Sequence, residues 1–103
     1  MADEWVKVAA TSEILPGMMK SYQVAGKEIL VANVNGNYYS IDNRCTHIGG
    51  PLARGKLTGN VVECPLHGSQ FDVRTGSVVR SPARTPEPRH EVKVESSEVL
   101  VKV

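Results

Sequence analysis

The chain has 103 residues, a length that predicts one domain able to bury a core without needing a metal for stability. Hydrophobic residues make up 41% and charged residues 22%, and the formal net charge of +1 provides no overall field to attract nucleic acid or a membrane. No apolar run approaches the roughly 18 residues of a membrane span, and the first residues do not resemble a secretory signal. We therefore expect a soluble, cytoplasmic protein.

The periodicity is strand-like along most of the chain, and no segment keeps a helical period. Alternating or β-rich runs predict strands, in chain order, at residues 6–8, 18–24, 28–34, 37–41, 91–95 and 99–103. One short turn is expected within residues 11–15. These patterns predict an all-β fold of short antiparallel strands.

Turn signals join the predicted strands into hairpins. Asn35-Gly36 lies between two β-rich runs, which is the strongest short-range hairpin signal. Gly26-Lys27 and Ser96-Ser97 predict two further turns. In the last hairpin, one face is expected to carry Val92, Val94, Val99, Val101 and Val103.

The middle of the chain has a different character. Residues 43–59, 65–69 and 81–88 are rich in Gly, Pro or Arg and show little alternation. Loops this long in a small domain are usually functional or disordered. Function is favoured here, because the candidate metal ligands lie within the first two segments or directly beside them.

Both cysteines and two of the three histidines fall into two short motifs. Cys45-Thr46-His47 is followed, after sixteen residues, by Cys64-Pro65-Leu66-His67. Two thiolates and two imidazoles form a four-ligand metal set, and the same set holds a [2Fe–2S] cluster in which histidines replace two cysteines on one iron. Neutral imidazoles remove two negative charges from the cluster, which raises its potential to roughly −150 to +300 mV.

Two other interpretations use the same residues. The four side chains could hold a structural zinc ion as Cys₂His₂, although C-x-H is an unusual spacing for that metal. A disulfide between Cys45 and Cys64 would leave the two histidines unexplained. His90 begins a strand pattern, and we expect it at the surface or at a strand start, without a metal.

The residues around both motifs resemble the cluster-binding loops of Rieske [2Fe–2S] proteins. The resemblance rests on Cys-Thr-His-Ile-Gly-Gly-Pro-Leu (45–52) and Cys-Pro-Leu-His-Gly-Ser-Gln-Phe-Asp (64–72), and it covers nearly the whole chain. It implies a Rieske-type antiparallel β-sandwich over residues 1–103, with a small cluster-binding subdomain inserted at about residues 43–82.

The resemblance also assigns roles to individual residues. It implies one [2Fe–2S] cluster per chain, held by Cys45, His47, Cys64 and His67. Around the cluster, Ser69 would donate a hydrogen bond to a bridging sulfide, and Pro82 would belong to a loop that covers the site. Gly50 and Gly68 would let the backbone approach closely.

Three departures separate this chain from the high-potential branch of the family. Gly50 and Leu66 occupy the places of a second cysteine pair, so the disulfide of that branch cannot form. Phe71 replaces a tyrosine that donates a hydrogen bond to a ligand sulfur, and no membrane anchor is visible. We therefore expect the soluble ferredoxin branch, with a potential in the lower half of the window above.

The resemblance implies an electron-transfer protein and no enzymatic activity of its own. We expect a monomeric one-electron carrier between a flavin-dependent reductase and the oxygenase of a ring-hydroxylating system. The alternatives are a small subunit of a larger oxidoreductase, such as an NADH-dependent nitrite reductase, and a redox or oxygen sensor. All six arginines lie between Arg44 and Arg89, and they are interpreted either as solvated surface or as including a ring around the cluster that favours its reduced form and steers an acidic partner. Charge reversal of Arg44, Arg54 and Arg80 would separate these interpretations.

Overall fold

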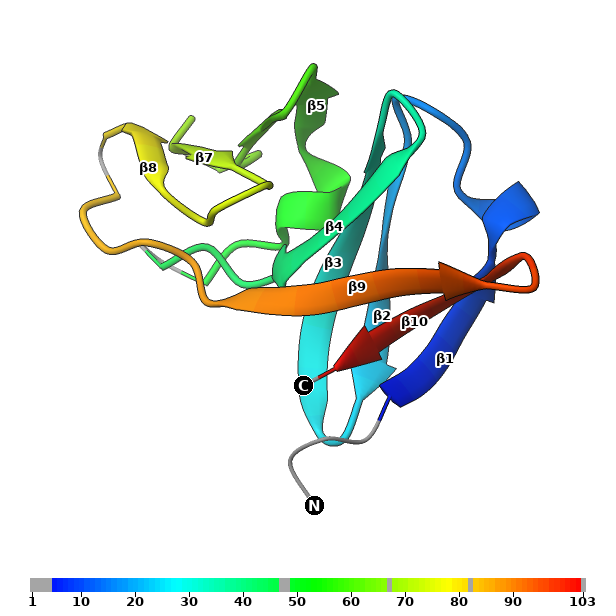
Figure 1. Ribbon diagram of the computed structural model, residues 1–103. Helices are drawn as coiled ribbons and strands as arrows, with labels where there is room; N and C mark the ends of the chain where they lie inside the picture. The colour runs from blue at the N-terminus through cyan, green and yellow to red at the C-terminus, as the bar shows by residue number, and fades with distance from the viewer. Residues whose placement is uncertain (1–4, 47–48, 67, 82, 103) are drawn as a thin grey trace.

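The computed structural model describes residues 5–46, 49–66, 68–81 and 83–102. Within these ranges the elements are all strands, apart from the 3₁₀-helical turns η1 (Thr11–Glu13) and η2 (Leu52–Arg54). The strands are β1 (Trp5–Ala10), β2 (Met19–Val24), β3 (Lys27–Val34), β4 (Asn37–Asp42), β5 (Lys56–Thr58), β6 (Val61–Glu63), β7 (Gln70–Asp72), β8 (Val78–Arg80), β9 (Arg89–Glu95) and β10 (Glu98–Lys102) (Figure 1). The predicted all-β fold is confirmed.

Two antiparallel sheets account for these strands. The larger has the order β1-β10-β9-β4-β3-β2, and the smaller has the order β5-β6-β7-β8. The smaller sheet comes from the segment between β4 and β9, and Figure 1 shows it beside the larger one. The fold is therefore an antiparallel β-sandwich with a small inserted sheet. None of the helices in the described ranges is long and apolar enough to cross a membrane.

Two of the predicted hairpin turns are confirmed. Asn35-Gly36 joins β3 to β4, and Ser96-Ser97 joins β9 to β10. In both turns the two central residues have positive φ, from 50° to 93°. This conformation belongs to the two-residue turns whose twist matches that of the flanking strands.

The third turn prediction is wrong by one residue. The turn between β2 and β3 consists of Ala25 and Gly26, with φ of 52° and 80°. Lys27 is already in β3, where it is the antiparallel partner of Val24. The ladder thus begins one residue earlier than the apolar pattern indicates, because a lysine can occupy the exposed end of a strand.

The predicted valine face of the last hairpin is confirmed only in part. Val99 and Val101 are fully buried, and Val92 is partly buried opposite Val101. Val94 lies opposite Val99 but is 47% exposed. β9 pairs with β4 only near Ser40 and Ile41, so Val94 has no neighbouring strand on that side. Val103 lies outside the described residues.

β3 is buried on both faces, and this places the site. Its residues Ile29 and Val31 face a core made with β1, β2 and β10, while Leu30 and Ala32 belong to a second core. A strand covered on both sides has a continuous apolar run, as Ile-Leu-Val-Ala does here. The second core also contains Ile41, Cys45, Leu52, Val62, Cys64, Phe71, Val73 and Ala83. It therefore joins the larger sheet to the inserted one and includes both cysteines.

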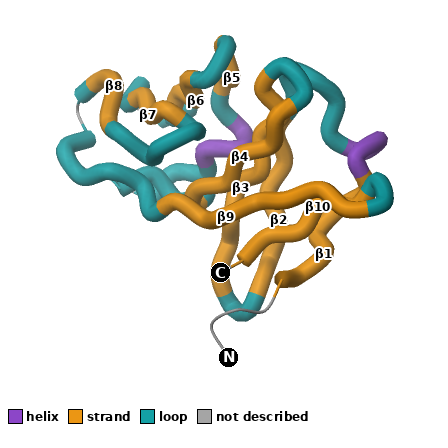
Figure 2. The backbone as a smooth tube through the Cα atoms, viewed as in Figure 1, coloured by secondary structure: helices purple, strands orange, loops and turns teal. Residues whose placement is uncertain are grey.

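The interpretation of residues 43–59 as irregular needs correction. That segment contains η2 and β5, which pairs with β6 through Leu57 and Val62. Each strand of the smaller sheet has only three residues, too few for alternation to appear in the sequence. Figure 2 shows long connections around this sheet, which include the predicted loop that leads from β8 to β9.

Candidate metal centre

The first predicted ligand loop closes on its own backbone. Cys45 is 3% exposed, its N–H donates to the carbonyl of Gly50 at 2.8 Å, and its carbonyl accepts the N–H of Gly49 at 2.7 Å. Gly49 has a φ of +76°, a conformation that favours glycine. The loop between these residues contains Thr46, while His47 lies outside the described residues.

The second loop repeats this arrangement at the same spacing. Cys64 is 1% exposed, its N–H donates to the carbonyl of Ser69 at 2.7 Å, and its carbonyl accepts the N–H of Gly68 at 3.2 Å. Gly68 has a φ of +78°, close to that of Gly49. His67 lies outside the described residues, as does Pro82, the residue predicted to belong to a loop that covers the site. Each cysteine is thus held through both its backbone N–H and its carbonyl by bonds within its own loop.

The two loops pack against each other at Gly50. A Cβ atom added there would lie 3.0 Å from the Sγ of Cys64 and 2.8 Å from a methyl carbon of Leu66. Gly50 therefore has no room for a side chain where the two loops meet, while the predicted close approach of its backbone to the cluster stays a prediction. Gly50 and Leu66, the places of the extra cysteines in the high-potential branch, are neighbours in space. Gly68 differs, because an added Cβ would meet only a Glu63 carboxylate oxygen at 3.8 Å. Glycine is favoured at this position by its positive φ and not by lack of space.

Ser69 links the second loop to the segment after β8. Its side chain is buried, and its Oγ accepts the N–H of Ala83 at 3.0 Å. A hydroxyl has one donor and two acceptor lone pairs, so this bond leaves the O–H of Ser69 able to donate to another group. The geometry is compatible with the predicted bond to a sulfide.

Glu87 is a residue of the site that sequence analysis missed. The residue is 3% exposed, and its carboxyl accepts the backbone N–H of Thr46 at 2.8 Å, inside the first ligand loop. Burial raises the pKa of this carboxyl to about 7, against the lowering effect of the Thr46 bond. The sequence Pro86-Glu87-Pro88 carries no apolar pattern that would indicate burial.

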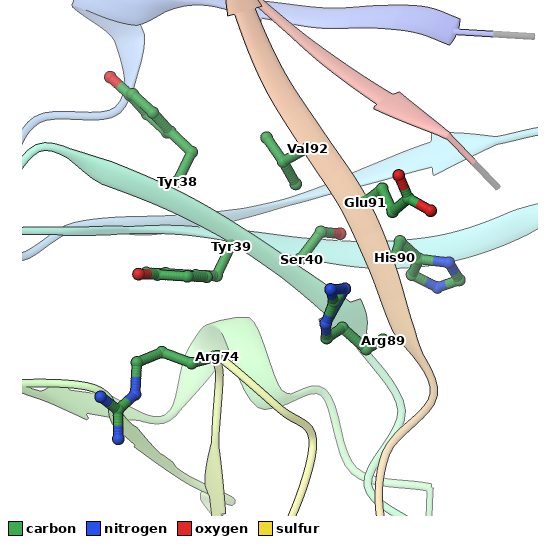
Figure 3. Close-up of a pocket in the computed structure, with 8 residues that line it drawn as sticks. All are labelled: Tyr38, Tyr39, Ser40, Arg74, Arg89, His90, Glu91 and Val92. Atoms are coloured by element: carbon green, nitrogen blue, oxygen red, sulfur yellow. The ribbon is translucent and has the colours of Figure 1, made fainter.

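The remaining histidine, His90, lies apart from the cysteines. Its Nε2 is 2.7 Å from the Oδ1 of Asp42, and its side chain is only 8% exposed. It lies second in β9, near the strand start as predicted, and it is not on the surface. It lines a cavity of about 250 Å³ between β4 and β9, and neither cysteine contributes to this cavity. Figure 3 shows His90 directed away from Tyr39 and Arg74 of the same cavity.

The family of the chain follows from comparison with known proteins. The model of the Rieske [2Fe-2S] domain matches residues 4–99. The chain belongs to the Rieske [2Fe-2S] family. Its cofactor is accordingly one [2Fe–2S] cluster per chain, and the zinc interpretation is set aside.

Relatives of this Rieske protein match it from end to end. The ferredoxin component of the naphthalene 1,2-dioxygenase system of Pseudomonas putida is 37% identical over 98% of this chain and 97% of its own length. The ferredoxin of carbazole 1,9a-dioxygenase from Nocardioides aromaticivorans has a TM-score of 0.93, with 34% identity over 95% of this chain and 96% of its own. A solved complex of reduced oxygenase and oxidized ferredoxin in carbazole 1,9a-dioxygenase contains a chain with a TM-score of 0.90 and 37% identity, over 95% of this chain and 92% of its own.

The described residues of this Rieske protein fit the cluster. Cys45 and Cys64 are thiols with no disulfide between them, both are buried in one apolar core, and the two loops that carry them touch. Thiolate sulfur is the ligand that holds one iron of such a centre. Phe71, also in this core, is fully buried and has no polar atom to offer a sulfur, which agrees with the lower-potential branch.

Proposed function

We propose that this Rieske protein is the ferredoxin component of a multicomponent ring-hydroxylating oxygenase. In this role it carries one electron at a time from a flavin-dependent reductase to a terminal oxygenase. The proposal is carried by the match to a dioxygenase ferredoxin component along 98% of this chain and 97% of the relative. The solved complex of oxygenase and ferredoxin in a carbazole system supports the choice of acceptor.

The proposed ligands are Cys45 and Cys64 on one iron and His47 and His67 on the other. Residues 1–103 are proposed to form one domain, with residues of about 43–82 as its cluster-binding subdomain. When bound, the cluster supplies a one-electron couple at a potential above that of an all-cysteine centre. The chain contributes rigidity, since each cysteine is fixed by its two backbone bonds and Ser69, the proposed donor to a sulfide, is fixed by its bond to Ala83.

The apolar core keeps water from the thiolate side of the cluster. Both thiols are almost fully buried, whereas Pro65 and Leu66, which precede His67, are exposed. Low dielectric strengthens the hydrogen bonds and charges that act on the cluster. The exposed side of the second loop is therefore the proposed exit for the electron, through the imidazoles.

The ligand assignment is tested by spectroscopy of the anaerobically purified protein. After reduction with dithionite, EPR is expected to give an average g-value below that of all-cysteine clusters, from mixed histidine and cysteine ligation. His47→Cys and His67→Cys should each abolish this signature, while His90→Cys should preserve it. A colourless protein with one zinc ion per chain would overturn the assignment.

The carrier role is tested by reconstitution with a flavin-dependent reductase and a ring-hydroxylating oxygenase. Substrate-dependent oxygen consumption should require this protein and saturate with its concentration.

We propose a monomer in the cytoplasm, without nucleic-acid or membrane partners, that cycles between its two proteins. Purification as a stable stoichiometric subunit of a larger reductase would instead support the nitrite-reductase alternative. The ferredoxin components among the relatives above favour the carrier.

A further inference from the structure

Glu87 is the only buried acidic side chain among the residues that the structure describes. One carboxyl oxygen, Oε2, accepts the N–H of Thr46, which lies between two of the proposed ligands. The other oxygen, Oε1, is buried and has no hydrogen-bond partner among the described atoms. A buried carboxyl with half of its hydrogen-bonding capacity unused is costly for the fold, so its position calls for a reason other than stability.

Backbone contacts fix this carboxyl in place. The N–H of Glu87 donates to the carbonyl of Gly76 at 2.8 Å, and a Cβ atom added at Gly76 would lie 2.1 Å from the carbonyl oxygen of Glu87. The neighbouring Thr85 accepts the hydroxyl of Thr46 at 2.6 Å, and Pro88 accepts the N–H of Asp42 at 3.0 Å. The segment 85–88 is thus fastened to β4, to the turn before β8 and to the first ligand loop.

No described cation forms an ion pair with this carboxyl. The ion pairs within the described ranges involve Lys7, Arg74, His90 and Lys93, each with another acid. The charged group that acts on Glu87 is Asp42, which has the same sign and is itself bonded to His90. Among the residues that the structure describes, no positive charge therefore compensates Glu87, which is buried in a low-dielectric region where its effect on a nearby redox centre is strongest.

We propose that Glu87 is a positioning residue that holds the first ligand loop through Thr46 and lowers the reduction potential of the cluster through its negative charge. The inference rests on the proposed function, because it needs a redox cluster at Cys45 and Cys64. An added electron is disfavoured by a fixed negative charge, so the oxidised form is stabilised relative to the reduced form. This effect adds to that of Phe71, which lacks the donor of the high-potential branch.

The charge is tested by Glu87→Gln with Glu91→Gln as the matched control. Glutamine keeps an oxygen acceptor for Thr46 and removes the charge, while Glu91 is an exposed acid on β9, outside these contacts. At about pH 8, where the carboxyl is ionised, the midpoint potential of Glu87→Gln should be higher than that of the wild type. Glu91→Gln should leave the potential unchanged. Equal potentials for Glu87→Gln and wild type, or equal shifts in the two variants, would overturn the proposal.

The positioning role is tested by Glu87→Asp, which keeps the charge and shortens the side chain. This variant should keep a potential near that of the wild type but lose its cluster faster, measured as iron per chain and decay of visible absorption. An unchanged rate of cluster loss would remove the positioning role. EPR of the wild type distinguishes failure of the Glu87 proposal from failure of the proposed function. Absence of a Rieske signal in the wild type would refute the proposed function itself.

Discussion

Replacing Gly50 by alanine tests the contact between the two ligand loops most directly. The new Cβ would lie 3.0 Å from the Sγ of Cys64 and 2.8 Å from Leu66, whereas unstrained carbon contacts are about 3.5–4.0 Å. Leu66 is 54% exposed and can rotate away. The Cys64 thiol is buried, and its backbone is bonded on both sides, so it must shift or the first loop must retreat.

Overpacking of this kind costs about 1–3 kcal/mol. Because the cost falls on a thiol that the cluster needs, we expect cluster retention to drop by roughly tenfold or more, at about 1.4 kcal/mol per factor of ten. The measurement is iron per chain together with the rate of cluster loss under a chelator. The unfolding midpoint, recorded in parallel, shows how much of the cost reaches the fold.

Two control variants separate the possible causes. Gly68→Ala places a side chain at positive φ with no close contact, so it measures backbone strain alone. The double variant Gly50→Ala/Leu66→Ala removes the leucine contact and keeps the contact with Cys64 Sγ. Gly50→Ala protein with wild-type iron content and loss rate would refute the reasoning. Full rescue by the double variant would assign the effect to Leu66.

Three further predictions concern side chains around the centre. Ser69→Ala removes the acceptor of the buried Ala83 N–H and should lower the free energy of unfolding in urea by about 1–3 kcal/mol. The reduction potential of the cluster in this variant should also fall, and an unchanged potential would limit the role of Ser69 to holding Ala83. Phe71→Ala empties a fully buried site and should cost about 3–5 kcal/mol, so a loss below 1 kcal/mol would contradict the shared core. Burial raises the pKa of Glu87 from 4.5 to about 7, so the folded state holds this proton more tightly and stability should fall as pH rises between those values. The expected loss is about 1–2 kcal/mol once solvent screening of the carboxylate is allowed for. Glu87→Gln should lack that loss, and parallel thermal midpoints for variant and wild type across this pH range would count against it.

The sequence is most informative where the rule involved is local. Asn35-Gly36 and Ser96-Ser97 form turns because of backbone conformation within two residues, and both turn predictions are confirmed. The run at 28–34 is recognisable as a strand because its apolar residues are consecutive. The spacing of Cys45 and Cys64 from their histidines likewise indicates a ligand set, because each motif lies within a few consecutive residues.

Features that depend on distant segments cannot be predicted in this way. The alternation of Val6 and Val8 suggests one buried face, but a register shift between Lys7 and Ala9 leaves Val6 exposed and buries Ala9. Glu87 is buried by contacts with residues about forty positions earlier, which leave no trace in its own neighbourhood. The three-residue strands of the smaller sheet are defined by their partners more than by their own pattern.

The pairing of β4 with β9 has a consequence for the order in which the molecule can assemble. Ile41 pairs with Arg89, and the N–H of Asp42 donates to Pro88, so the chain leaves and re-enters the larger sheet at one place. Bringing the ends of a long segment together costs conformational entropy that grows slowly with its length. That cost is met by strand pairing in the larger sheet, away from the cysteines. The framework can therefore close without iron, and the ligand loops are then presented to an incoming cluster already side by side.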